Sequence, residues 1–159
     1  MTTNMLDLKL ATYDYFSDII DMARKFHEAS PYHGLEDYDE SQVSDKILQF
    51  LESPGKAVII LLVHPDTNKA VGMVIGIVTE GIFNRNRVAA EIAWWVDQEH
   101  RGKQSLELFE AYLYWADHVA KCDTVSMALL EDEKIEGLSR LYKRKGFVPT
   151  ERAFIRKKK

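Results

Sequence analysis

The sequence predicts a single α/β domain of the α+β type, with helices on both faces of a mixed, mostly antiparallel sheet of about six or seven strands. The chain has 159 residues, 46% of them apolar, and no internal repeat or linker, which indicates one domain over residues 1–159. Apolar spacing switches between period two and helical spacing in the order β-α-α-β-β-β-α-β-α-β. Strands that precede a β-α-β-α-β half are typical of a mixed sheet.

The first elements are a strand and two helices. Leucines that alternate with polar residues predict a half-buried strand over Leu6–Thr12. Helical spacing of apolar residues predicts a helix over 14–29, which Ser30-Pro31 ends because the residue before a proline avoids the α region. The same spacing predicts a second helix over Ser41–Leu51.

Three strands follow. The run Ala57–Val63 is apolar and rich in β-branched residues, which is typical of a strand covered on both faces. A short polar turn separates it from the strand predicted at Ala70–Thr79, so these two form an antiparallel hairpin. A polar turn then leads to a strand over Val88–Val96.

The last part of the chain alternates helices and strands. A long helix is predicted over 103–120, a strand over Thr124–Leu130, a helix over Ile135–Lys145 that Gly146 ends, and a final strand over Phe147–Ile155. In the long helix the predicted buried face consists of Leu106, Phe109, Leu113, Ala116 and Ala120.

Composition excludes several classes of protein. With 21 Lys and Arg against 25 Asp and Glu, the net charge of −4 argues against a nucleic-acid partner. The one cysteine, Cys122, cannot form an internal disulfide and is expected to be a buried structural thiol; no Cys/His cluster has zinc spacing, so no metal is expected. The longest apolar run is far shorter than the ~20 residues that span a bilayer, and the N-terminus lacks a secretory signal. We therefore expect a soluble, cytoplasmic protein with no membrane partner.

A loop between a strand and a helix is the first candidate site. Arg101, Gly102 and Lys103 lie in this loop, and a helix begins directly after them. The first turn of a helix has unpaired N–H groups and a partial positive charge, Gly102 permits close approach of a ligand, and Ser105 suits a helix start. The pattern fits an anion site, most naturally for a diphosphate, but also an ordinary turn before a helix.

Glu91 is the second candidate. Strand alternation predicts Glu91, Ala93 and Trp95 on one face, with Ile92, Trp94 and Val96 on the other. A carboxylate buried among apolar neighbours would have a raised pKa, which suits a general base. The alternative is that Glu91 lies at the solvent-exposed end of its strand and pairs with Arg85 or Arg87.

Tyr142 is the third candidate. It lies one helical turn before Gly146, and a phenol can hydrogen-bond a developing thiolate and return a proton to it. The alternative is an amphipathic tyrosine packed at the end of a helix.

Together these features resemble the GNAT N-acetyltransferase superfamily, and loosely its bacteriophage-encoded members. The strand ending Trp-Trp-Val and the following Gln-Glu-His-Arg-Gly-Lys loop resemble the family's acetyl-CoA-binding motif. Leu-Tyr-Lys-Arg-Lys-Gly-Phe resembles its later tyrosine motif, and the element order matches from Leu6 to Ile155.

The resemblance implies an acetyl-CoA-dependent N-acetyltransferase that moves acetyl directly to an amine in a ternary complex. Glu91 and Tyr142 match the positions of the base and the thiolate partner. The N–H groups of Arg101, Gly102, Lys103, Gln104 and Ser105 would hold the pyrophosphate, and the backbone of Val96 would face the pantetheine or thioester. The strands ending near Val96 and Met127 would splay to admit the pantetheine arm.

Departures from the family pattern leave a rival function open. Gln104 and Leu106 stand where small residues are expected, although a one-residue deletion would restore the register at Ser105. Ile135 stands where many members have an asparagine. The rival is a GNAT-fold interaction or structural module with weak or no activity.

The partner would be a small-molecule or protein amine. His27, His33 and the acidic segment after them either attract a cationic amine or form a solvated loop. The basic C-terminal run Arg156–Lys159 is typical of a solvated chain end. Many relatives dimerise through their final strands, so a homodimer is compatible with the resemblance.

Overall fold

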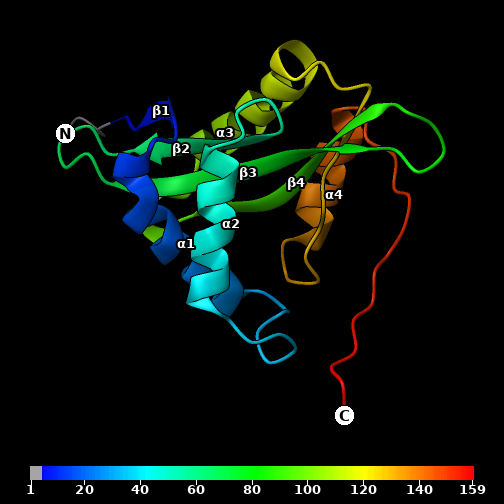
Figure 1. Cartoon of the computed structure of the whole chain (residues 1–159), viewed down its shortest axis with the longest axis horizontal. Coiled ribbons are helices and arrows are strands. Elements are labelled where there is room, and N and C mark those ends of the chain that lie inside the picture. Colours follow the sequence, from blue (N-terminus) through cyan, green and yellow to red (C-terminus); the bar gives the residue numbers. More distant parts are fainter. Residues whose placement is uncertain (1–4) are drawn as a thin grey trace.

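The computed structural model describes residues 5–159, which form a five-stranded sheet with helices on both faces (Figure 1). The strands are adjacent in chain order, and every pair is antiparallel except β4 and β5, which are parallel. This confirms a mixed, mostly antiparallel sheet. The strands are β1 (Asp7–Leu10), β2 (Ala57–Val63), β3 (Ala70–Glu80), β4 (Arg87–Val96) and β5 (Thr124–Ser126). The helices are α1 (Phe16–Ala29), α2 (Glu40–Leu51), α3 (Lys103–Tyr114) and α4 (Ile135–Arg144).

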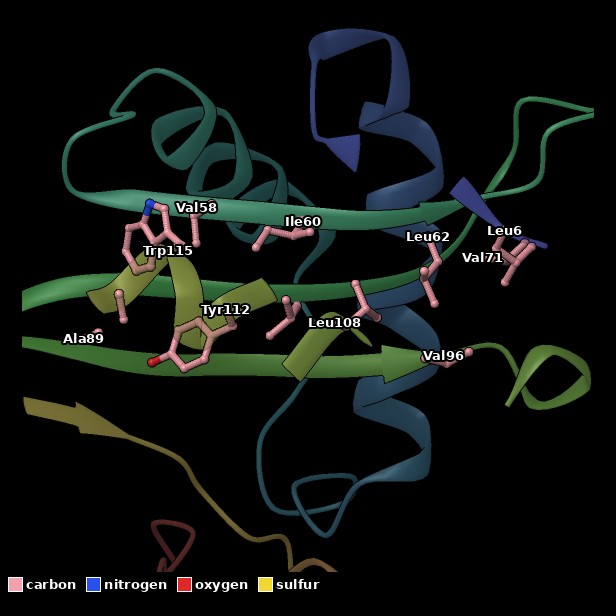
Figure 2. Packing of buried hydrophobic residues seen from close by; sticks show 12 residues of the cluster. Leu6, Val58, Ile60, Leu62, Val71, Ala89, Val96, Leu108, Tyr112 and Trp115 are labelled. Atoms are coloured by element: carbon pink, nitrogen blue, oxygen red, sulfur yellow. The ribbon is translucent and has the colours of Figure 1, made fainter. Parts of the chain in front are cut away.

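The core lies in two layers, one on each face of the sheet. α1 and α2 pack on the face that carries Ile59 and Leu61 of β2. α3 packs on the opposite face, where Leu108 and Tyr112 belong to one hydrophobic cluster with Ile60 of the same strand (Figure 2). All seven residues of β2 are buried, which confirms a strand covered on both faces.

The strand predicted over Phe147–Ile155 does not form, and the sheet has five strands rather than the six or seven predicted. Val148 and Phe154 are exposed, and an ion pair between Arg152 and Glu131 holds this part of the chain. β-propensity measures how well a side chain fits a half-buried pleated surface, and Phe147–Ile155 pairs with none of the strands β1 to β5.

Two other predictions need correction. β1 is exposed along its whole length, so the half-buried strand is wrong, and Leu6 just before it is the buried leucine. In the predicted buried face of the long helix, Phe109 and Ala116 are buried, but Leu106 is 44% exposed, and the buried Leu108 and Tyr112 were not predicted. The predicted helix over 103–120 also changes at Trp115–Val119 to a π-helical turn, which moves later side chains off an α-helical stripe.

β3 has a glycine where α3 packs tightly on the sheet. A Cβ on Gly76 would lie 2.5 Å from Cε2 of Tyr112, whose side chain is fully buried. Gly76→Ala is therefore expected to lower the free energy of unfolding by about 2 kcal/mol, because a buried ring cannot move aside without strain. Urea denaturation measures the change. Gly55→Ala is the matched control, since a Cβ there meets no atom within 4 Å, and equal stability of the two variants would contradict this packing.

Candidate active site

β4 and β5 pair for only a short distance and then separate. The parallel pairing runs from Val88 and Thr124 to Ala90 and Ser126, and β5 ends there, although the sequence predicted a strand to Leu130. We call the region beyond Ala90 and Ser126 the β4–β5 splay. Polar side chains from three elements meet there, so it is the candidate active site.

A bulge in β4 decides where Glu91 points. Ile75 of β3 pairs with Ala93 and the next residue pairs with Glu91, so Ile92 is the extra residue of a β-bulge. The bulge shifts the alternation: Trp94 and Val96 pack in the α3 layer, whereas Ala93 and Trp95 pack in the α1–α2 layer. The prediction that Glu91 shares a face with Ala93 and Trp95 is therefore wrong.

Glu91 and Tyr142 meet at a single residue of the splay. The Ala128 N–H donates to Oε1 of Glu91 at 3.4 Å, and the Tyr142 hydroxyl donates to the Ala128 carbonyl at 3.2 Å. The two side chains come from β4 and α4, far apart in sequence. The structure thus brings the two predicted catalytic residues into one site.

Burial sets the proton affinity of this site. It raises the pKa of Glu91 to about 7, against the opposing effect of the Ala128 N–H. Burial, and secondarily the charge of Glu91, raises the pKa of Tyr142 well above its ordinary value, so this hydroxyl stays protonated and acts as a donor. The alternative prediction, an ion pair between Glu91 and Arg85 or Arg87, is wrong. Arg87 donates to the Ala120 carbonyl, and no ion pair to Glu91 occurs within residues 5–159.

Tyr112 is a residue of the site that sequence reasoning missed. Its hydroxyl donates to the Ser126 carbonyl at 3.2 Å, so Tyr112 and Tyr142 bond to alternate carbonyls of the same segment. The negative charge of Glu91 contributes, after burial, to raising the pKa of Tyr112. The available signal was its helical spacing from Leu108 and Phe109, which places all three on one face.

Backbone donors remain free in the predicted anion loop. Ser105 N–H donates to the Gly102 carbonyl at 3.0 Å, and Gly102 N–H donates to Oγ of Ser105 at 3.3 Å, which caps α3. In the described part of the chain, the N–H groups of Lys103 and Gln104 have no partner. A Cβ on Gly102 would meet no atom within 4 Å. The start of α3 is therefore open to an anion.

The side chains of Gln104 and Arg101 hydrogen-bond to backbone groups in different parts of the chain. Gln104 binds the backbone of Leu6, accepting its N–H at 2.9 Å and donating to its carbonyl at 2.8 Å. This side chain ties α3 to the chain just before β1, which explains a large residue where the resemblance implies a small one. Nε of Arg101 donates to the Val96 carbonyl at 2.8 Å. That carbonyl is therefore engaged within the chain.

The other residues singled out in the sequence lie outside this constellation. Cys122 is half-buried, and burial raises the pKa of its thiol, which fits the predicted structural role. His27 packs against His33 and Tyr38 and bonds the Glu36 carbonyl at 2.8 Å, so the acidic loop makes contacts within the chain. Its role toward an amine stays a prediction.

Within residues 5–159 no three or more His, Cys, Asp or Glu side chains are placed to hold a metal ion. Nor does any helix of that range have the length and apolarity to cross a membrane.

Comparison with known proteins rests on structure alone. No family model and no curated protein sequence matches the chain. An acetyltransferase of Trypanosoma brucei superposes with a TM-score of 0.68 at 19% identity, over 94% of this chain and 96% of that one. The aminoglycoside N-acetyltransferase AAC(6')-Iy in complex with CoA gives 0.73 at 11% identity, over 99% and 97%. A ribosomal-protein-alanine N-acetyltransferase of Brucella melitensis biovar Abortus 2308 gives 0.66 at 13% identity, over 94% and 97%.

The chain has the GNAT acetyltransferase fold. These likenesses cover almost the full length of each protein, so the resemblance seen in the sequence is confirmed at the level of the fold. The likeness to bacteriophage-encoded members stays a prediction.

Proposed function

We propose that this chain is an N-acetyltransferase that uses acetyl-CoA and transfers the acetyl group directly to an amine acceptor in a ternary complex. The observation that carries the proposal is the meeting of Glu91 and Tyr142 at Ala128 in the β4–β5 splay. A buried carboxyl with a pKa of about 7 and a protonated phenol can serve as the general base and the general acid in aminolysis of a thioester.

The residues present fit acetyl-CoA. The unpartnered N–H groups of Lys103 and Gln104, with Arg101 and the open approach at Gly102, would receive the diphosphate. The capping contact between Gly102 and Ser105 would hold those donors in place. The splay next to Glu91 would receive the pantetheine arm, beside the backbone of Val96. Acetyl-CoA supplies the activated acetyl group as a thioester.

Each catalytic residue then moves one proton. Glu91, ionised above its pKa, takes the proton from the acceptor ammonium and so frees the nitrogen lone pair. The nitrogen forms a bond to the thioester carbonyl carbon, and the bond from that carbon to sulfur breaks. Tyr142 donates its hydroxyl proton to the leaving thiolate in place of its bond to the Ala128 carbonyl. The nitrogen, positively charged after the attack, releases a second proton, which restores the phenol of Tyr142. The proton taken up by Glu91 passes to solvent, so the products are the neutral amide and CoA.

For the acceptor we propose only a chemical class, an amine. A complex of AAC(6')-Iy holds a bisubstrate analogue of CoA and monomethyl-acetylneamine, an example of an amine acceptor on this fold. For this chain we propose a small-molecule or protein amine, whose protonated form would be attracted to a carboxylate such as that of Glu91. A panel of polyamines, aminoglycosides and peptides, scored by thiol release from acetyl-CoA, would identify it.

Binding of the co-substrate separates this proposal from a catalytically inactive interaction module. Gly102→Ala gives the sharpest contrast, because the added methyl meets no atom of the chain and yet lies at the predicted diphosphate site. We expect an unchanged melting temperature without ligand. In millimolar acetyl-CoA the wild type should be stabilised by ligand binding, and the variant should lose most of that shift.

A thermal-shift scan of both proteins makes the measurement, with Gly55→Ala as the matched glycine control. Absence of any shift for the wild type would contradict acetyl-CoA binding and favour the interaction module. If Gly102→Ala kept the wild-type shift in melting temperature, the diphosphate would not bind at the start of α3.

A further inference from the structure

We propose that Trp95 and Asp97 position Arg101 for the diphosphate of the co-substrate, so that the buried carboxylate of Asp97, paired with Lys25 of α1, sets the affinity for CoA. This inference rests on the proposed function, because it takes the loop before α3 as the diphosphate site. It assigns roles to residues outside the splay that the catalytic steps do not use.

Asp97 is the buried anchor of this arrangement. Its side chain is 5% exposed and directly follows β4, where the chain turns toward the loop. Oδ1 accepts the indole N–H of Trp95 at 2.9 Å and lies 3.3 Å from Nζ of Lys25 on α1. Lys25 in turn lies 3.1 Å from Oδ2 of Asp21. A buried carboxylate is costly unless paired and hydrogen-bonded, so these partners hold Asp97 in one geometry.

Asp97 also fixes the backbone of the loop. Its N–H donates to the Val71 carbonyl of β3 at 2.8 Å, and its carbonyl accepts the N–H of His100 at 2.9 Å. The short 3₁₀ turn Gln98–His100 is thus tied to the sheet at the residue that carries the buried carboxylate. Arg101 follows this turn directly, so its backbone position depends on the same anchor.

Trp95 connects the anchor to Arg101. Its indole N–H bonds Asp97, while the guanidinium carbon of Arg101 lies 4.7 Å from the centre of its ring. Nε of Arg101 donates to the Val96 carbonyl, which fixes the other side of the same group. Stacking on an aromatic face together with one hydrogen bond restricts a side chain that is otherwise among the most flexible.

The restrained Arg101 keeps donors to spare. Among the residues the structure describes, its two Nη nitrogens have no hydrogen-bond partner. They lie on the loop that leads directly into the unpartnered N–H groups of Lys103 and Gln104. A planar pair of N–H donors matches a phosphate group, and restraining it beforehand lowers the entropy lost on binding.

The test compares CoA with pantetheine, which lacks the phosphates, by titration calorimetry on the full chain. We expect Arg101→Ala to weaken CoA binding about tenfold and Trp95→Phe about fivefold, because Trp95→Phe keeps an aromatic ring but loses the N–H to Asp97. Neither variant should change pantetheine binding. In the Arg101→Ala background, Trp95→Phe should have little further effect, since it acts through Arg101.

Three further variants make the result specific. Asp97→Asn keeps an oxygen for the indole N–H and should retain more CoA affinity than Asp97→Ala. Arg85→Ala, at an exposed arginine between β3 and β4, is the charge-matched control and should bind CoA as the wild type does.

The outcomes separate the two proposals. A wild type that binds neither CoA nor acetyl-CoA would overturn the proposed function. If the wild type binds CoA, any one of three results would overturn the positioning role alone. These results are additive losses of CoA affinity in the double variant, a loss of pantetheine affinity equal to the loss of CoA affinity, and unchanged CoA affinity in Trp95→Phe.

Discussion

Replacing Glu91 with glutamine is expected to lower kcat about a hundredfold or more, because an amide cannot accept the proton of the acceptor ammonium. The pH dependence of kcat/KM identifies the role of Glu91 more specifically than the rate alone. In the wild type, kcat/KM should rise as pH increases through about 7, where the Glu91 carboxyl ionises. Initial rates across pH 5 to 9, with thiol release as the signal, measure both effects, and the rise should be absent from the residual activity of Glu91→Gln.

The same carboxyl should be visible in stability without any substrate. Glu91 binds its proton more tightly in the folded chain, with a pKa of about 7, than at its ordinary value of 4.5. The free energy of unfolding should therefore fall as pH rises from 4.5 to 7 and level off above 7, a loss of as much as about 3 kcal/mol. Glu91→Gln removes this loss and should be more stable than the wild type at pH 8.

Glu80→Gln, at an exposed position at the end of β3, is the matched control and should leave the rate and its pH dependence unchanged. If Glu91→Gln kept both the wild-type rate and the rise near pH 7, Glu91 would not be the base. Equal stabilities at pH 8 would show that the carboxyl is not buried as described.

Tyr142→Phe is expected to lower kcat about tenfold to a hundredfold while leaving the Kd for acetyl-CoA within about twofold of the wild-type value. The phenyl ring retains the packing of Tyr142 against Phe109 and Phe147, and only the hydroxyl that would protonate the thiolate is lost. Steady-state rates and calorimetric titration separate the two quantities. Tyr114→Phe, at a 63% exposed tyrosine of α3, is the control, and a loss of affinity matching the loss of rate would assign Tyr142 to binding instead.

The sequence predicted the order of helices and strands better than it predicted the geometry of the candidate site. The order of the α-helices and strands up to Arg144 followed from the apolar pattern, whereas the 3₁₀ turns and the π-helical turn did not. Glu91, Tyr142 and the Arg101–Ser105 loop stood out by residue type and position. The bulge at Ile92 could not be predicted, because it depends on which residues of β3 pair with β4. Since it reverses the face of every later side chain, Glu91 was predicted beside the wrong neighbours.

Three other features were not predicted from the sequence. Phe147–Ile155 has the composition of a strand, but a strand forms only where another offers its edge, and that is a property of the whole fold. Tyr112 was missed because the predicted buried face of its helix included Leu113 at that turn, whereas the fully buried residue is the neighbouring Tyr112. Gln104 departed from the family pattern because its side chain binds the backbone of Leu6, a contact between distant parts of the sequence.

A crystal structure of the chain with CoA tests the central claim most directly. The proposed function predicts the diphosphate on the N–H groups of Lys103 and Gln104, and the sulfur in the splay within hydrogen-bonding distance of the Tyr142 hydroxyl and on the same side of β4 as Glu91. CoA bound elsewhere, with the Tyr142 hydroxyl still on the Ala128 carbonyl and the splay unoccupied, would contradict it.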